Sequence, residues 1–282
     1  MVYNASTSYY DEQQDFSNPY NQLVIEISNC HLVCMLLKEN NQEMIGFEYF
    51  PIDKSNSIEQ KDTFETVLIN SRLLNYGIKN PHIYFNNEQC LPVPAAMFEE
   101  DLAADYVNAI YGDDYESEVF HDVVSIMPGF KIVYRVQQNL SNFLRQKFHQ
   151  ASFHHTYSYI IKRLLENVSE NSNEVIKLQF YSRFFIASVI KNGELTIIQT
   201  YEFDGVGDVL FALLNMVKQF QINQSTVTLQ LSGIIDPSLL VWEHIKQHFN
   251  HVIADEIKNP LFSNVSAGQP LYYFSPFINL VS

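Results

Sequence analysis

The sequence predicts an α/β protein that contains one structural unit twice, and three observations lead to this fold class. First, a strand, a hairpin, a helix and another strand follow one another from Leu23 to Phe85. Second, the same order returns from Glu174 to Leu231. Third, 282 residues with 46% hydrophobic content exceed the usual size of one domain and can fill two modest cores. A long-period repeat of this kind determines the architecture before any single residue identifies a reaction.

The first copy opens with stretches of apolar residues. Leu23 to Ile27 is a predicted strand, and after Ser28-Asn29 a second strand runs from His31 to Leu37. We expect Asn40-Asn41 to form the turn of an antiparallel hairpin with a third strand, Met44 to Phe50, because asparagine tolerates positive φ.

A helix and a strand complete the first copy. The apolar residues between Ser57 and Tyr76 fall on one side of a helix, and Gly77 stands where a helix would stop. The short apolar strand from His82 to Phe85 follows.

The second copy repeats these elements with a clearer turn. Asn192-Gly193 predicts a hairpin between Phe184 to Ile190 and Leu195 to Tyr201. The helix from Asp208 to Phe220 has an apolar stripe that a sheet must cover, and the strand from Thr226 to Leu231 follows it.

A strand, hairpin, helix and parallel strand in this order make a ribonuclease-H-like lobe, since the return to the sheet requires a crossover. Two such lobes form the duplicated architecture of actin, the sugar kinases and Hsp70. We therefore expect a mobile tail over residues 1–21, a first lobe with extra helices over 22–168 and a second lobe over 169–282, with the polar segment Asn167 to Asn173 as the linker.

The extra elements of the first lobe and the end of the second follow from the same patterns. We expect helices at Ala95 to Tyr111, Gln137 to Phe148, Tyr157 to Val168 and Ser238 to Phe249, a strand pair at Val119 to Ile126 and Ile132 to Val136 joined through Pro128-Gly129, and apolar segments at His251 to Ala254 and Leu271 to Phe274.

Composition excludes several classes of function. Seventeen basic and thirty-two acidic residues give a formal charge of −15, which disfavours binding to nucleic acid. No apolar run is long enough to span a membrane, and the N-terminus does not have the pattern of a signal peptide. Three cysteines without CxxC spacing favour buried, reduced thiols. We therefore expect a cytoplasmic protein.

Several short segments resemble a known family. Tyr201-Glu202-Phe203, Leu213-Leu214, Leu231-Ser232-Gly233 and the closing Tyr272-Tyr273-Phe274 with Leu280 resemble domain-of-unknown-function family 3822, which has an actin-like ATPase fold and is known mainly from Bacteroidetes-type bacteria. More distantly, the passage from Ile132 to the helix with Leu164 resembles pilus-assembly actin-like proteins. The resemblance covers the chain after Asn21 and implies the fold, but it brings no established activity.

The ATP chemistry of that superfamily would require an Asp-x-Gly turn in each lobe, because glycine lets backbone amides approach phosphates and aspartate organises magnesium. The first copy has Ser28 in its turn, and the second has Phe180 and Tyr181, whose rings we expect to occupy the phosphate space. Ser232-Gly233 stands where a double glycine binds adenosine. Gly205 and Gly207 next to a helix start could seat an anion, although we favour a turn with a capping aspartate there.

The histidine groups and acidic clusters of the sequence favour structural or solvent-exposed roles over a functional site. His244 and His248 lie one helical turn apart near His251, but the sequence between them lacks the glutamate of a HExxH motif, so we expect an exposed helix face and no metal site. For His149, His154 and His155 we expect capping or surface packing. The acidic pairs at Glu99 to Asp101 and Asp113-Asp114 predict a solvated face.

Two hypotheses for function follow. The preferred one is a non-catalytic actin-like module without a cofactor that binds an unidentified protein partner or forms a homo-oligomer. The alternative is a divergent nucleotide-binding ATPase with a nonstandard phosphate cradle in the cleft between the lobes, for which the candidate residues are Ser28, Gly205, Gly207, Ser232 and Gly233.

Overall fold

A computed structural model describes residues 5–38, 43–52, 59–125, 129–166, 174–235, 240–255, 269–278 and 280. The described chain divides into two compact units. The first takes in the residues up to Ile160 together with Leu280, and the second takes in the residues from Ile161 to Asp255 and 269–278. The predicted linker at Asn167 to Asn173 lies outside the described residues, so the boundary at residue 168 stays a prediction.

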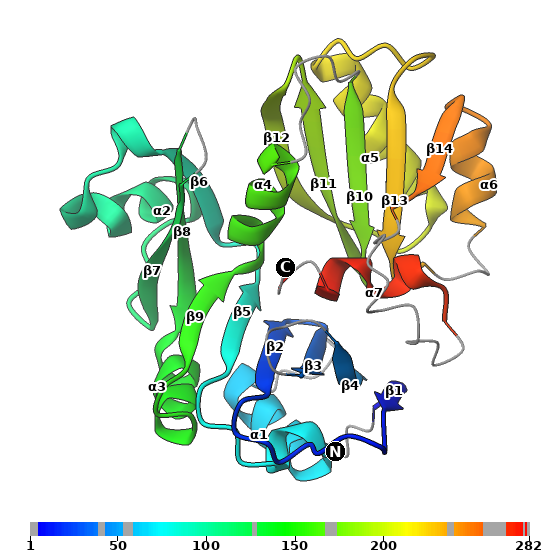
Figure 1. The fold of residues 1–282 in the computed structure, drawn as a ribbon. Helices are drawn as coiled ribbons and strands as arrows, with labels where there is room; N and C mark the ends of the chain where they lie inside the picture. Colours follow the sequence, from blue (N-terminus) through cyan, green and yellow to red (C-terminus); the bar gives the residue numbers. More distant parts are fainter. Residues whose placement is uncertain are drawn as a thin grey trace. The chain divides into compact units, whose positions relative to one another are not determined.

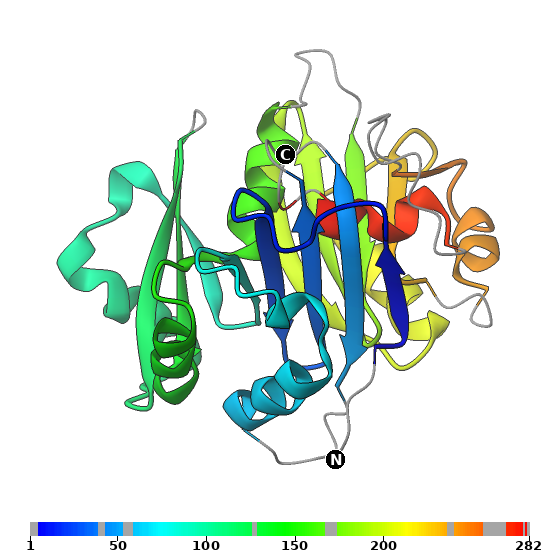
Figure 2. The same cartoon turned by 60° about the horizontal axis from the view of Figure 1, so that its bottom comes forward.

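The first unit is built on a six-stranded sheet in the order β1-β4-β3-β2-β5-β9 (Figures 1 and 2). β2 pairs antiparallel with β3 and parallel with β5, and β5 pairs parallel with β9. The strands are β1 (Thr7–Tyr10), β2 (Gln22–Ser28), β3 (His31–Leu37), β4 (Met44–Pro51), β5 (His82–Asn86) and β9 (Ser152–His155).

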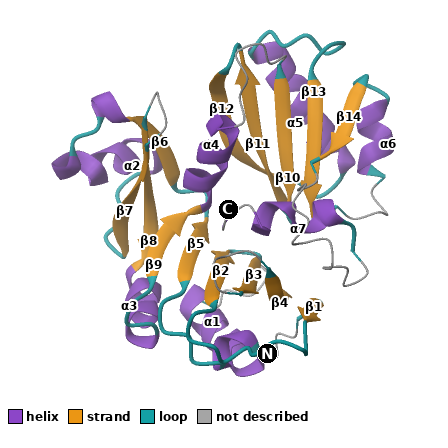
Figure 3. Ribbon diagram, viewed as in Figure 1, coloured by secondary structure: helices purple, strands orange, loops and turns teal. Residues whose placement is uncertain are grey.

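The second unit contains a five-stranded sheet in the order β12-β11-β10-β13-β14 (Figure 3). β10 pairs antiparallel with β11 and parallel with β13, as β2 does with β3 and β5. The strand pairing shifts in register at a similar place in the two units. The shift lies between Leu36 and Leu37 where β3 pairs with β4, and between Val189 and Ile190 where β11 pairs with β12. The strands are β10 (Val175–Phe180), β11 (Phe184–Lys191), β12 (Glu194–Glu202), β13 (Thr228–Gly233) and β14 (His251–Ala254). The predicted duplication is confirmed.

The turn between β11 and β12 has the backbone that its sequence predicts. Asn192 and Gly193 both adopt positive φ, at 53° and 80°. Such a turn matches the twist of the strands it joins, which is why this dipeptide is a strong hairpin signal. The corresponding Asn40-Asn41 of the first copy lies outside the described residues.

The first crossover helix is shorter than predicted. α1 (Gln60–Asn70) ends at Ser71, and a 3₁₀ turn, η2 (Leu73–Asn75), follows it. The cause is Glu48, a buried residue of β4, whose carboxylate accepts hydrogen bonds from the Ser71 hydroxyl at 2.5 Å and the Arg72 amide at 2.8 Å. A side-chain acceptor replaces the helical carbonyls at this point, so the helix stops.

An insertion between β5 and β9 adds a three-stranded sheet in the order β6-β8-β7. α2 (Ala103–Tyr111) packs on this sheet around Val93, Val107 and Val133 (Figure 1). The predicted helix from Ala95 to Tyr111 is interrupted, because an extended residue, Phe98, follows the first of two 3₁₀ turns that precede α2. The elements are β6 (Cys90–Pro94), η3 (Ala95–Met97), η4 (Glu100–Leu102), β7 (Ser117–Val124), β8 (Phe130–Gln137) and α3 (Gln138–Lys147).

Helix α5 (Val206–Gln219) covers the core of the second unit. Its buried residues Val209, Leu213 and Met216 pack with Leu178 and Leu229 of the sheet. This helix is the predicted amphipathic crossover. The remaining helices are α4 (Thr156–Glu166), which runs across the boundary of the two units, α6 (Val241–Lys246), shorter than predicted, and α7 (Leu271–Ile278). No helix in the described parts of the chain is long and apolar enough to cross a membrane.

The N-terminal segment departs from the expected mobile tail. Residues 7–10 form β1, which pairs antiparallel with β4 at the edge of the sheet. Phe16 is buried, its ring stacks on Tyr76 at 5.2 Å, and the Arg72 guanidinium lies over it at 5.1 Å. Aromatic and cation–π contacts thus hold a segment that has no apolar period in its sequence.

Candidate functional site

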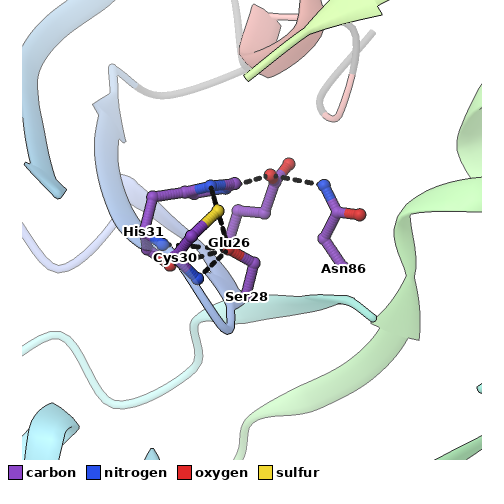
Figure 4. Close-up of polar contacts among 5 residues, drawn as sticks. All are labelled: Glu26, Ser28, Cys30, His31 and Asn86. Carbon is purple, nitrogen blue, oxygen red and sulfur yellow. Dashed lines mark hydrogen bonds and ion pairs between the residues drawn. The ribbon is translucent and has the colours of Figure 1, made fainter. Parts of the chain in front are cut away.

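The turn between β2 and β3, where a phosphate loop would lie in the first unit, is closed by a buried polar network (Figure 4). The Ser28 hydroxyl accepts hydrogen bonds from the backbone amides of Cys30 at 3.2 Å and His31 at 3.0 Å, and its Oγ lies 2.8 Å from His31 Nδ1. His31 Nε2 lies 2.7 Å from Glu26 Oε1, which also accepts from Asn86 Nδ2 at 3.0 Å. The polar groups of this turn are therefore committed to one another, except that Glu26 Oε2 is buried without a hydrogen-bond partner among the described residues.

The charge of His31 is set by its neighbours. Burial alone would lower the pKa of this fully buried imidazole, but hydrogen bonds and charge interactions with Cys30 and Glu26 outweigh burial and raise the pKa to about 9. At neutral pH the ring is therefore an imidazolium. It donates from Nε2 to Glu26 Oε1, and its Nδ1 faces Ser28 Oγ at 2.8 Å.

This network bears directly on the candidate residue Ser28. A phosphate binds a turn through free backbone amides. The amides of Cys30 and His31 already donate to the Ser28 hydroxyl, and that hydroxyl is buried. Binding an anion here would have to break these hydrogen bonds.

The equivalent place in the second unit is closed by backbone packing. Phe180, the last residue of β10, is the register partner of Gly233, the last residue of β13. Gly233 has φ of +94°, and a Cβ added to it would lie 2.1 Å from the Phe180 carbonyl oxygen. The amide of Ile234 donates to that same oxygen at 2.9 Å. Close approach of two strands therefore explains why position 233 is glycine.

The aromatic side chains of this turn lie inside the unit. Phe180 belongs to the core, with its ring 5.4 Å from Phe185 and 5.9 Å from Phe203. Tyr181 stacks on Phe184 at 4.6 Å and meets Phe277 of α7 edge-on at 6.0 Å. We expected these rings to occupy a phosphate space. They fill the interior of the unit instead, because β10 is buried on both faces near its end. The neighbouring Ser232 is also buried.

Gly205 and Gly207 lie at the start of α5. The Oδ2 atom of Asp208 accepts hydrogen bonds from the amides of Asp204 at 2.9 Å and Gly205 at 3.1 Å. Asp208 therefore occupies, with its own carboxylate, amides that an external anion would use. Its position is N3 of the helix and not the cap itself, which is Gly205. Around both glycines there is open space within 4 Å of an added Cβ.

A pocket of about 260 Å³ lies wholly in the first unit, at the ends of β2, β5 and β8. Polar groups dominate its wall, among them Asn29, Gln60, Asn87, Asp114, Arg135 and Gln137. The buried Arg135 donates to the Gly112 carbonyl at 2.5 Å and to Asn108, whereas its Nε has no hydrogen-bond partner among the described residues. A hydrogen bond from Ser117 lowers the pKa of Asp114, so both signs of charge border the pocket.

The histidines provide no metal centre in the described parts of the chain, where no three His, Cys, Asp or Glu residues group closely enough to hold an ion. His155 is a buried capping residue, as the sequence suggested. Its Nδ1 accepts from the amide of Tyr157 at 3.1 Å, at the start of α4. Burial lowers the pKa of His155 to about 4, so this ring is neutral where His31 is charged.

Comparison with known families identifies the chain's relatives. The family described as "Protein of unknown function (DUF3822)" matches residues 11–252. The chain belongs to this family. No curated protein matches it significantly in sequence.

Solved structures support the fold assignment of this DUF3822 chain. A Bacteroides thetaiotaomicron VPI-5482 protein with an actin-like ATPase fold and unknown function superimposes with a TM-score of 0.75 at 17% identity, over 86% of this chain and 93% of that one. A chain of the PilM–PilN type IV pilus biogenesis complex gives a TM-score of 0.57 at 9% identity, over 92% of this chain and 97% of that one. The expected family and the actin-like α/β fold are both confirmed.

The five candidate residues thus fall in three separate turns. Ser28 belongs to the first unit and the other four belong to the second, where Gly205 and Gly207 precede α5 while Ser232 and Gly233 end β13. Glu26, His31 and Asn86 were not among the residues predicted from the sequence. A glutamate inside the apolar strand Leu23 to Ile27 was the available signal, because an unpaired carboxylate is rarely buried.

We predict that His31 makes stability fall at alkaline pH. A pKa raised from 6.5 to about 9 stabilises the fold fully below pH 6.5, and this stabilisation disappears as the pH rises through 9. The contribution amounts to about 3 kcal/mol in the free energy of unfolding. Urea unfolding of the parent and His31→Gln between pH 6 and 10 measures it. The variant should lose much less free energy over this range, and equal losses in the two proteins would contradict the assignment.

We also predict that Gly233→Ala is strongly destabilising, by about 3 kcal/mol or more, because its Cβ would collide with the Phe180 carbonyl at a positive φ. Gly207→Ala is the matched control. Its Cβ meets open space in the first turn of a helix, so stability should be unchanged or gain up to about 1 kcal/mol. Chemical denaturation of both variants tests the pair, and a Gly233→Ala protein as stable as the parent would disprove the packing explanation.

Proposed function

We propose that this actin-like-fold protein is non-catalytic and acts by binding a protein partner or another copy of itself. The proposal rests on one observation: groups of the protein itself occupy the three turns in which a nucleotide would have to bind. The hydroxyl of Ser28, the carboxylate of Asp208 and the carbonyl of Phe180 each take the backbone groups or the space that a nucleotide would need. Each turn serves the stability of its own unit.

General properties of the fold support a binding role. The same fold hosts unrelated functions, so the fold does not by itself confer ATPase activity. One structure with this fold comes from the PilM–PilN complex, in which an actin-like protein is assembled with another protein. That example supports the class of function and names no partner for this chain.

The cysteines fit a reducing compartment, as the sequence suggested. Cys30, Cys34 and Cys90 are all buried, and none of them forms a disulfide bond with another described residue. Burial raises the pKa values of the Cys34 and Cys90 thiols well above the usual range of a cysteine, so the reactive thiolate form is disfavoured at both positions. We therefore propose a structural role for these thiols in the cytoplasm.

One observation favours the alternative of a divergent nucleotide-binding ATPase. The space around Gly205 and Gly207 is open, so a ligand could approach the start of α5 without meeting a side chain there. In this alternative Asp208 would have to rotate away from the amides it now occupies. Ser28, Ser232 and Gly233 would have to contribute from the ends of buried strands.

Thermal unfolding with nucleotide tests the proposal. We expect millimolar ATP with magnesium to leave the melting temperature of the full chain unchanged within about 1 °C. A bound ligand at one hundred times its Kd would add about 2.7 kcal/mol to stability, which is a shift of several degrees.

A matched pair of variants interprets a positive result. Gly205→Val adds a side chain in open space at an extended backbone position, so its fold should be intact. A dose-dependent rise in melting temperature in the parent that Gly205→Val abolishes would reject the proposal and establish the alternative.

A further inference from the structure

The insertion of the first unit presents an apolar stripe on the side of α2 next to its buried face. Val107 faces the three-stranded sheet and is fully buried. Tyr106 and Ile110 lie four residues apart and share one side of α2, and Leu102 is the N-cap residue that immediately precedes the helix. Leu102 and Ile110 are 40% and 62% exposed.

Hydrogen bonds hold a fourth apolar residue beside this row. The Tyr106 hydroxyl donates to the Met97 carbonyl at 2.6 Å and accepts from the Glu99 amide at 3.1 Å. The ring of Phe98 stacks on Tyr106 at 5.8 Å. Met97, which is 69% exposed, is therefore fixed next to α2, and we call Met97, Leu102, Tyr106 and Ile110 the α2 stripe.

Exposed apolar side chains are concentrated in this part of the molecule. Of the twelve exposed large hydrophobic residues in the described chain, six lie between Met97 and Val123. Tyr115 is the most exposed, at 90%. Single exposed apolar residues are ordinary, but a concentration on one small insertion indicates a binding surface.

Exposed acidic side chains outnumber basic ones around the stripe. β8 contributes Lys131, whose Nζ lies 5.5 Å from the Phe98 ring, and Arg135, which is buried and bonded to Asn108 and the Gly112 carbonyl. Between Lys79 and Lys131 the sequence contains ten acidic residues and no lysine or arginine. Glu99, Glu100, Asp101 and Asp105 are exposed at the start of α2, and Asp113 is exposed shortly after its end. A second copy of the chain would bring the same charges, and nucleic acids and anionic membranes would be repelled as well. The exposed acidic border therefore favours a partner that supplies positive charge.

We infer that the α2 stripe and its acidic border form a docking surface for an amphipathic segment of a partner protein that is rich in lysine or arginine. The inference rests on the proposed binding function and specifies the partner's chemistry. Apolar side chains of the segment lie on Met97, Leu102 and Ile110, and its basic side chains face Glu99 to Asp101 and Asp105. The apolar contacts supply affinity, while the charges accelerate association and make it sensitive to salt.

The test is a selection from random peptides of about 16 residues, displayed on phage and panned against the full chain; this length is sufficient for a short helix. The recovered peptides should combine lysine or arginine with leucine, methionine or aromatic residues. The double variant Met97→Ser with Ile110→Ser should weaken their binding at least about tenfold. The triple variant Glu99→Gln, Glu100→Gln and Asp101→Asn should weaken binding and reduce its dependence on salt.

The matched control removes equally exposed apolar residues elsewhere. Ile69 on α1 and Phe211 on α5 are 80% and 71% exposed. The double variant Ile69→Ser with Phe211→Ser should bind the peptides as the parent does, and thermal unfolding should show that all variants keep the fold.

Three results would overturn the docking surface: no peptide is recovered, the recovered peptides lack basic residues, or the stripe variant binds as well as its control. This experiment is independent of the nucleotide test. A chain that selects such peptides and also binds ATP with magnesium refutes only the non-catalytic function, whereas one that binds neither refutes only the docking surface.

Discussion

Parallel pairing between the first strand of each repeat and the strand after its helix is the constraint on which each unit depends. β2 pairs with β5 and β10 pairs with β13, and in both cases a helix must cross over to connect them. That helix has to bury one face on the sheet, which explains the apolar stripe of α5. The same pairing brings the ends of two strands together at one edge, Ser28 beside Asn86 in the first unit and Phe180 beside Gly233 in the second.

The two units close these equivalent edges by different chemistry. In the first, the charged His31 links the Ser28 turn to Glu26, and Asn86 joins from the paired strand. This pair has no exposure, and Glu26 Oε2 has no hydrogen-bond partner among the described residues, so the contacts of Glu26 Oε1 and of the imidazole must offset the cost of burial. In the second, aromatic rings fill the interior, and a glycine allows the backbones of β10 and β13 to approach closely. Both solutions favour a stable edge: the Cys30 and His31 amides donate to Ser28, and the Ile234 amide donates to the Phe180 carbonyl. Our proposal of a non-catalytic role follows from this comparison.

Local signals in the sequence were sufficient for most of the core but not for its long-range contacts. Asn192-Gly193 determines a turn through its own φ angles, and the spacing in α5 predicts its buried face. The end of α1 could not be predicted in this way, because it depends on Glu48, a residue 23 positions earlier that caps it from the sheet. The pairing of β1 has a similar origin. Its partner β4 is distant in sequence, and its stabilising contacts come from Arg72 and aromatic rings. Glu26 gave a signal as a carboxylate in an apolar strand, but only the hairpin register shows that His31 meets it.

The insertion is the part of the molecule in which function can change without loss of the fold. In the repeated core, strands such as β3 and β11 are buried along almost their whole length, so a substitution there affects packing on both faces. In the insertion, α2 packs on the sheet through one cluster around Val93, Val107 and Val133, with partly exposed residues around it. Val107 is the buried residue of α2, and five of its nine positions are exposed, so these five are free of packing constraints. Among the described residues of the second unit, α6 is the element between the corresponding strands, β13 and β14, so the duplicated halves differ most where the insertion stands. The apolar and acidic surface of α2 does not stabilise the duplicated core. Because the first unit has this insertion and the second unit has no counterpart among its described residues, we place partner recognition on α2.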